Sequence, residues 1–104
     1  MPAPLWRESE QAGTFHGSPV DARDGFIHLS SAEQISGTAA RHFGGAEDLL
    51  LLAVRTASLD IRWEPSRGGD LFPHLYGALP MASVVWVRPL PLIDGVHGLP
   101  DLGP

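Results

Sequence analysis

Residues 24–30, with the sequence DGFIHLS, form a short apolar run that contains one histidine and one hydroxyl group. Successive side chains of a strand point to opposite faces, so an extended run directs Ile27 and Leu29 toward one side. The Asp-Gly pair at its start is typical of a turn. We therefore predict a strand with one face in the core and the other facing a cleft. The cleft face carries Phe26, His28 and Ser30.

Two segments have apolar positions near helical spacing, residues 4–12 and residues 31–43. Gly13 follows the first segment and Gly44-Gly45 follows the second, and glycine is common just beyond a helix end. The second segment also begins with serines followed by Glu and Gln, which is the pattern of a capping box. We predict helices at both places and a loop over residues 14–24, where glycine, proline and aspartate are frequent.

Three further stretches predict strands. Residues 49–54 are continuously apolar, as in a central strand that is covered on both faces. Residues 61–64 alternate between apolar and polar, so Arg62 and Glu64 share a face. Residues 84–87 are rich in residues that favour strands.

A second histidine string, residues 71–77 with the sequence LFPHLYG, repeats the arrangement of the first. In extended form, Phe72, His74 and Tyr76 share one face. Pro73 cannot donate to a sheet ladder, so this segment is expected to be an edge strand, a bulge or a loop over a pocket. Because each histidine lies near a hydroxyl group, the two strings are the main candidates for a functional site.

Together, these elements predict a small α+β protein with a curved, mixed or split β-sheet and one or two helices. A length of 104 residues fits a single domain over residues 1–104. Residues 89–104 are rich in proline and glycine and are expected to form an irregular tail. No apolar run approaches the ~20 residues of a membrane span, and no secretory signal is recognised, so we expect a cytoplasmic protein.

The chain contains no cysteine and no lysine. The sequence therefore excludes a disulfide, a thiol nucleophile, a zinc–thiolate site and Schiff-base chemistry. The net charge of −5 disfavours a non-specific nucleic-acid binder, which uses basic residues to neutralise phosphates, and no DNA partner is expected. Arginine remains the only side chain with a permanent positive charge for an anionic ligand.

Several kinds of site are compatible with these residues. A metal centre would use His28, His74 and Glu64. The same side chains with Tyr76 would also make a general acid–base pocket, although the spacing selects no reaction. A serine hydrolase would pair Ser30 or Ser31 with a histidine, but neither serine lies in a Gly-x-Ser-x-Gly elbow.

A cleft for a nucleotide-like ligand is the fourth kind of site. Trp63 or Phe72 would stack on a base or a nicotinamide ring. Arg62 or Arg67 would face a phosphate, and the histidine and serine of the first string would bond ribose hydroxyls. The structural alternative is that the aromatic residues only fill the core and that the first histidine bonds a backbone carbonyl.

Taken together, several strings along the chain resemble a bacterial family called domain of unknown function 952. The strings with histidine are the most specific, and the match covers nearly the whole chain. The residues that carry the resemblance are Trp6, Gly13, DGFIHLS at 24–30 with Gln34, Phe43, Leu51-Leu52, RWE at 62–64 and LFPHLYG at 71–77. We identify the chain as a member of this family, which has no established activity.

That family resembles in fold the ADP-ribosyltransferases, most closely the NAD-binding lobe of RNA 2'-phosphotransferases. The resemblance implies a split, strongly curved mixed sheet with a cleft for NAD, ADP-ribose or another nucleotide-like ligand. It places His28 on the cleft strand, with Glu64 and His74 on the opposite wall, as the candidate catalytic residues. The candidate ligand-contacting residues are Ser30, Arg62, Trp63, Arg67, Phe72 and Tyr76.

Two features depart from this pattern. Members of the family usually begin with a strand ahead of the tryptophan helix, and the residues before Pro4 leave no room for it. Either the gene start lies further upstream, or this member is a reduced version whose cleft is half built. In the transferases the same strand carries a His-Gly-Thr that holds the nicotinamide ribose, and no His-Gly-Thr occurs in this sequence. Three alternatives stay open: a transferase-like enzyme that uses NAD, a binding module that has lost the chemistry, and a metal-dependent enzyme.

Overall fold

The computed structural model of the chain describes residues 1–103, except for the side chain of Arg67. Within these residues it contains α-helices, short strands and two 3-10 turns. The helices are α1 Ala3–Ala12, α2 Pro19–Asp24 and α3 Ile35–His42, and the turns are η1 Arg67–Gly69 and η2 Met81–Ser83. The strands are β1 Thr14–Phe15, β2 Ile27–His28, β3 Leu50–Val54, β4 Ile61–Pro65, β5 Leu71–Leu75, β6 Leu79–Pro80, β7 Val84–Pro89, β8 Leu92–Ile93 and β9 Val96–His97.

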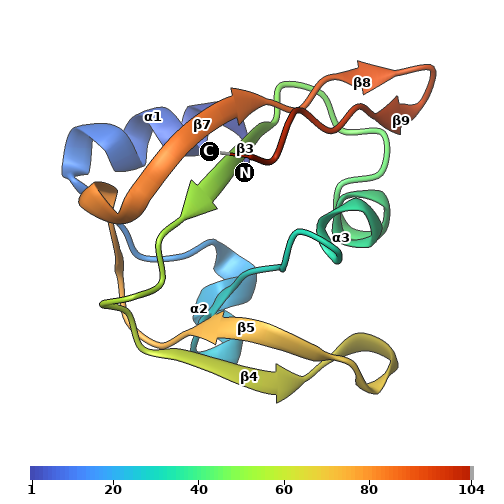
Figure 1. The fold of residues 1–104 in the computed structure, drawn as a ribbon. Coiled ribbons are helices and arrows are strands. Elements are labelled where there is room, and N and C mark those ends of the chain that lie inside the picture. Colours follow the sequence, from blue (N-terminus) through green and yellow to red (C-terminus); the bar gives the residue numbers. More distant parts are fainter. Residues whose placement is uncertain (104) are drawn as a thin grey trace.

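The strands form four small sheets, and every pairing among the described residues is antiparallel. The largest has the order β2-β5-β4, and the others are the pairs β1-β6, β3-β7 and β8-β9. Figure 1 shows the β3–β7 pair and the β4–β5 ladder at opposite ends of the molecule, with α2 and α3 between them. The predicted α+β class is confirmed, but the prediction of a mixed sheet is wrong. Short connections such as those of β4–β5 and β8–β9 allow only antiparallel neighbours.

Helix α1 ends as the sequence predicts, because Gly13 takes the left-handed conformation, with φ of 82°, just beyond it. Helix α3 begins at Ile35, later than the predicted start at residue 31. Only half of the expected capping box forms: Ser31 N donates to Gln34 Oε1 at 3.0 Å, and Gln34 Nε2 donates to Leu71 O at 2.7 Å. Gln34 therefore ties the turn before α3 to strand β5.

Helix α2 occupies part of the segment that was expected to be a loop, so that expectation is wrong for residues 19–24. The Ser18 hydroxyl accepts from Asp21 N, and the Asp21 carboxylate accepts from Ser18 N at 2.7 Å, which is a complete capping box. Pro19 fits the first helical position, where no N–H is needed. The same proline and polar residues that suggested a loop are thus the start of a short helix.

The segment around Pro73 lies in the middle of the largest sheet, not at an edge, so the prediction of an edge, bulge or loop is wrong. Leu29 N donates to Pro73 O at 3.1 Å, which means that the backbone groups of Pro73 face β2. The N–H that Pro73 lacks would face Leu29, just beyond the last residue of β2. The β2–β5 ladder therefore lacks a donor only at its end. The ladder with β4 keeps all of its donors.

Strand β3 is confirmed, but the prediction that it is central and covered on both faces is wrong. It pairs with β7, and all of its residues are half-buried. On its other side, the chain start contacts only its beginning: Met1 and Leu50 exchange backbone hydrogen bonds of 3.0 and 2.8 Å, and Pro2 forms an isolated bridge with Leu49. The tail also contains more structure than expected, since residues 92–97 form the β8–β9 hairpin. Its turn residues Asp94 and Gly95 have φ of 51° and 80°, as a two-residue hairpin turn requires.

The main hydrophobic core lies on one face of the β2-β5-β4 sheet, and a second cluster lies between α3 and the chain around β3 and β7. Leu75 is fully buried at the centre of the first cluster. The first cluster comprises Phe15, Ile27, Leu75 and Leu79, and the second comprises Ala39, Leu49 and Leu90. None of the described helices is both long and apolar enough to cross a membrane.

Replacing Leu75 with alanine tests this core. We expect Leu75→Ala to lower the free energy of unfolding by about 2–5 kcal/mol, because the cavity left in a packed core adds to the lost transfer energy. Leu71→Ala on the same strand is the matched control, since Leu71 is 51% exposed and its removal changes stability by only about 0.5 kcal/mol. Urea unfolding followed by tryptophan fluorescence measures both values. Equal losses in the two variants would contradict this placement of the core.

Candidate functional site

The face of the β2-β5-β4 sheet that is turned away from the main core gathers most of the predicted site residues. His28 and Arg62 are both register partners of His74, and Glu64 is the partner of Phe72. Paired residues of a ladder project to the same side of the sheet, so these side chains share one face. We call it the histidine face, and it carries His28, Arg62, Glu64, Phe72, His74 and Tyr76.

Asp21 connects helix α2 to this face. Its Oδ2 accepts from Ser18 N at 2.7 Å and from Ser18 Oγ at 3.0 Å. Its Oδ1 accepts from His28 N at 3.1 Å and lies 2.6 Å from His28 Nδ1. One buried carboxylate therefore caps the helix and orients the first histidine ring at the same time.

His28 contacts a second carboxylate through its other ring nitrogen. Nε2 lies 2.9 Å from Asp24 Oδ2, in addition to the contact of Nδ1 with Asp21. Both ring nitrogens of His28 therefore lie within hydrogen-bond distance of a carboxylate oxygen, which fixes the orientation of the ring. A hydrogen bond from Arg23 and, to a smaller extent, the charge of His28 hold the pKa of Asp24 below its ordinary value.

The second histidine is buried and lies in a different network. His74 is 3% exposed, and its Nδ1 lies 2.9 Å from Glu64 Oε1. The Tyr76 hydroxyl donates to the same Glu64 oxygen at 2.7 Å. The hydrogen bond with His74 and then that from Tyr76 lower the pKa of Glu64, and the hydrogen bond to Glu64 raises the pKa of Tyr76.

Phe26 joins the two histidine networks. Its ring stacks on His74 with centroids 4.0 Å apart and an angle of 16° between planes, and it lies 4.7 Å from the ring of His28. The two imidazole rings lie 5.6 Å apart. The structure thus brings the two histidine strings together, but as neighbours in one sheet. The expectation that they form opposite walls of a cleft is wrong, because β2 and β5 are directly paired.

The remaining predicted residues have different surroundings. Arg62 lies over the Tyr76 ring, 4.2 Å from its centroid, and forms an exposed ion pair with Asp60 at 3.0 Å. Ser30 Oγ bonds Thr38 Oγ1 at 2.8 Å, which ties β2 to α3. Trp63 belongs to the other face of the sheet and is 54% exposed. Phe72 is buried within the histidine face, and the side chain of Arg67 lies outside the described residues.

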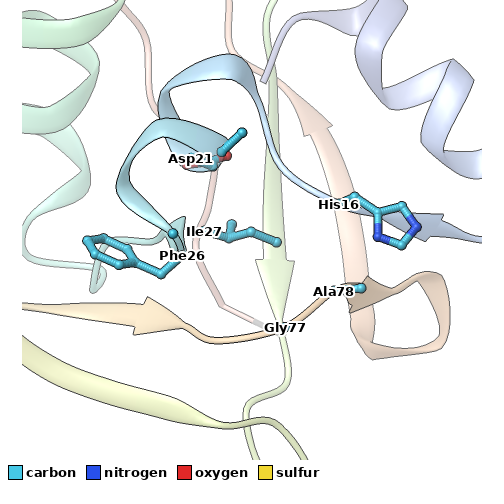
Figure 2. A pocket seen from close by; sticks show the side chains of 8 residues that line it. His16, Asp21, Phe26, Ile27, Gly77 and Ala78 are labelled. Atoms are coloured by element: carbon cyan, nitrogen blue, oxygen red, sulfur yellow. The ribbon is translucent and has the colours of Figure 1, made fainter.

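A cavity of about 300 Å³ lies beside the histidine face. Figure 2 shows Phe26 and His16 at opposite ends of it, with Ile27 between them and Asp21 on the adjoining helix. Phe26 and Asp21 therefore border the cavity and also contact the histidine networks. Gly77 and Ala78, in the segment after β5, complete its wall.

Sequence reasoning missed the residues that hold the two histidines. The predicted loop over residues 14–24 gives Asp21 no role, although the Ser18-x-x-Asp21 spacing is a signal for a capped helix start. The Asp-Gly pattern indicates only a turn at Asp24 and not its contact with His28. Phe26 was placed on the correct face of its strand but was given no role. Contacts such as these depend on which strands pair, and no local pattern reveals that.

The metal-centre alternative finds no support in the side-chain arrangement. Among the described residues, no group of three or more histidine, aspartate or glutamate side chains is placed to hold one ion. His28 and His74 instead direct ring nitrogens toward separate carboxylates, Asp21 and Glu64.

The family match includes the two strands that carry the histidines. Residues 1–87 match the family described as "Protein of unknown function (DUF952)". The chain belongs to the DUF952 family. The prediction of membership is therefore confirmed, and the further likeness to ADP-ribosyltransferases stays a prediction.

Solved structures of protein CC0527 from Caulobacter crescentus are similar to this DUF952 chain. The X-ray structure is 44% identical with a TM-score of 0.88, over 94% of this chain and 89% of that one. The solution NMR structure is 46% identical with a TM-score of 0.83, over 92% and 85% of the two chains. No curated protein matches the chain.

The pKa of Tyr76 gives a direct test of the Glu64 network. Tyr76 is the only tyrosine of the chain, so an alkaline titration of phenolate absorbance reports this residue alone. The hydrogen bond to the Glu64 carboxylate and, to a smaller extent, its negative charge disfavour the phenolate, so we expect Glu64→Gln to lower the pKa of Tyr76 relative to the wild type. Glu10→Gln, at an exposed position of α1, is the control and leaves the titration unchanged. An unaltered Tyr76 titration in Glu64→Gln would refute the hydrogen bond.

Proposed function

We propose that this protein binds a nucleotide-like small molecule, of the class of NAD or ADP-ribose, at the histidine face beside the cavity. The proposal rests on the hydrogen bonds that the two oxygens of the Glu64 carboxylate accept. Its Oε1 accepts from both His74 and Tyr76, whereas the described residues place no donor on Oε2. The side chain is 37% exposed, so Oε2 is available to a ligand.

A carboxylate fixed in this way suits the hydroxyl groups of a ribose. Two donors hold the first oxygen, so little conformational freedom is lost when the second oxygen accepts from a ligand. Acidic side chains bind ribose hydroxyls in the same manner in dinucleotide-binding folds. The ring of Phe26, which borders the cavity, adds an aromatic surface for a flat heterocycle.

The charges on this face favour particular parts of such a ligand. Four carboxylates lie in or beside this face. Among the side chains that the structure describes, Arg62 is the arginine of the face, and it lies at the open edge of the sheet. Negative charge attracts a cationic ring such as oxidised nicotinamide and repels phosphate. We therefore expect the nicotinamide riboside part of NAD to contact Glu64 and Phe26, with the phosphates directed toward Arg62. The carboxylates are Asp21, Asp24, Asp60 and Glu64.

Titration of the purified protein with NAD and with ADP-ribose tests the proposal. We expect saturable shifts of the His28 and His74 ring signals in NMR spectra. Glu64→Gln keeps the shape of the side chain but removes its charge, and we expect it to weaken binding by roughly tenfold or more. Glu10→Gln serves as the control and binds like the wild type. Absence of any shift at millimolar ligand would refute the proposal.

The ligand could be turned over at this site or only bound, and the surroundings of the two histidines favour binding without turnover. His28 contacts a carboxylate with each ring nitrogen, and His74 is buried and stacked under Phe26, so access of a substrate to either ring is restricted. This favours a binding module over an enzyme in which His28, Glu64 and His74 are catalytic. An assay for nicotinamide release from NAD separates the two: measurable release points to the enzyme, and ligand shifts without release point to the binding module.

A further inference from the structure

Strand β4 is the outer strand of the largest sheet. It pairs with β5 on one side, and no strand of the described residues pairs with it on the other. Figure 1 shows β4 at the lower boundary of the molecule, with no element beyond it. An open edge of this kind exposes backbone groups that are able to pair with another strand.

The hydrogen bonds at its ends show which residues of β4 turn their backbone groups outward. Tyr76 N donates to Asp60 O at 3.0 Å, and Ser66 N donates to Asp70 O at 2.9 Å. Backbone groups alternate in direction along a strand, so even-numbered positions from 60 to 66 face β5. The N–H and C=O of Trp63 and the C=O of Pro65 therefore face outward. Ile61 N also turns outward, although it makes a local bond to Leu59 O.

The side chains along this edge combine opposite charges with an exposed aromatic ring. Arg62 and Glu64 lie on the histidine face, and Trp63 lies between them on the opposite face with 54% of its surface exposed. Leu71, the partner of Pro65 in the ladder, is 51% exposed on the same face as Trp63. The edge thus presents apolar surface on one side and a complementary charge pair on the other.

We propose that a second copy of this chain pairs with it through β4, antiparallel and centred on Trp63. In this register the two Trp63 residues face each other and exchange both backbone hydrogen bonds. Arg62 of each copy then lies opposite Glu64 of the other. Directly opposed residues of opposite charge stabilise an antiparallel pair, and like charges destabilise it.

A shift of the centre by one residue in either direction is unfavourable. A pairing centred on Arg62 would oppose the two Arg62 side chains, and a pairing centred on Glu64 would oppose the two carboxylates. Pro65 is compatible with the register centred on Trp63, because it lies opposite Ile61 and contributes only an acceptor. Of the three registers, the one centred on Trp63 is therefore the only one without opposed like charges.

The contacts that now hold Arg62 do not prevent this pairing. Its ion pair with Asp60 is exposed, with 57% and 53% of the two side chains accessible, and pairs of this kind contribute little stability. The paired state joins two three-stranded sheets into one continuous sheet. It also places a guanidinium of the second copy beside each Glu64, which adds positive charge next to the proposed ligand site.

Sedimentation of the ligand-free wild type over a range of concentrations gives the first test. We expect a reversible monomer–dimer equilibrium. In Arg62→Glu, the introduced carboxylate of each copy would lie opposite Glu64 of the other copy. We expect this repulsion to weaken dimerisation by roughly tenfold or more. Arg7→Glu makes the same charge change at an exposed position of α1 and should leave the equilibrium unchanged. A wild type that stays monomeric at millimolar concentration, or equal effects of the two variants, would overturn the proposal.

Cross-linking tests the register itself. The chain has no cysteine, so a single introduced cysteine reports one position. Opposed hydrogen-bonded residues lie about 5.5 Å apart between Cα atoms, within the range of a disulfide. We expect Trp63→Cys to form a disulfide-linked dimer upon mild oxidation, and Leu71→Cys, equally exposed, to do so at least tenfold more slowly. Equal rates would refute the register. Because both tests are made without ligand, their failure leaves the proposed ligand site untouched.

Discussion

The antiparallel pairing of β2 with β5 is the constraint on which the arrangement of this protein depends. It sets Ile27 opposite Leu75 and His28 opposite His74. Since side chains alternate along a strand, one register fixes both the hydrophobic core and the histidine face. A slip by one residue would expose Ile27 and bury the polar ring of His28 in its place. The burial of Leu75 therefore maintains the positions of the two histidines.

Short elements next to this strand pair position the side chains of the candidate site. Helix α2 has only the residues Pro19–Asp24, yet Asp21 at its third position accepts four hydrogen-bond contacts from Ser18 and His28. A buried carboxylate is tolerated because these donors replace water. Phe26 then packs against His74 and borders the neighbouring cavity. The capping of α2, the orientation of the His28 ring and the shape of the cavity therefore depend on the same short segment, which contains Asp21 and Phe26.

Charged residues on the outer strand have two physical effects. Arg62 and Glu64 disfavour a pairing of the open edge that is centred on either of them, because each of these registers opposes like charges. In the symmetric register centred on Trp63, by contrast, each Arg62 lies opposite a Glu64 and the charges match. Glu64 also accepts from His74 and Tyr76, so the edge of the sheet and the histidine face share a residue. Changes at Glu64 are therefore expected to affect both.

The sequence by itself determined the local features of this protein. Alternation put Arg62 with Glu64 and Phe72 with His74 on common faces, and Gly13 marked the end of α1, because these patterns depend on neighbouring residues only. Tertiary structure decided the rest: β5 became a central strand despite Pro73, and Asp21 reached His28. Such outcomes depend on hydrogen bonds between segments far apart in the chain, and these are set by the packing of the whole core.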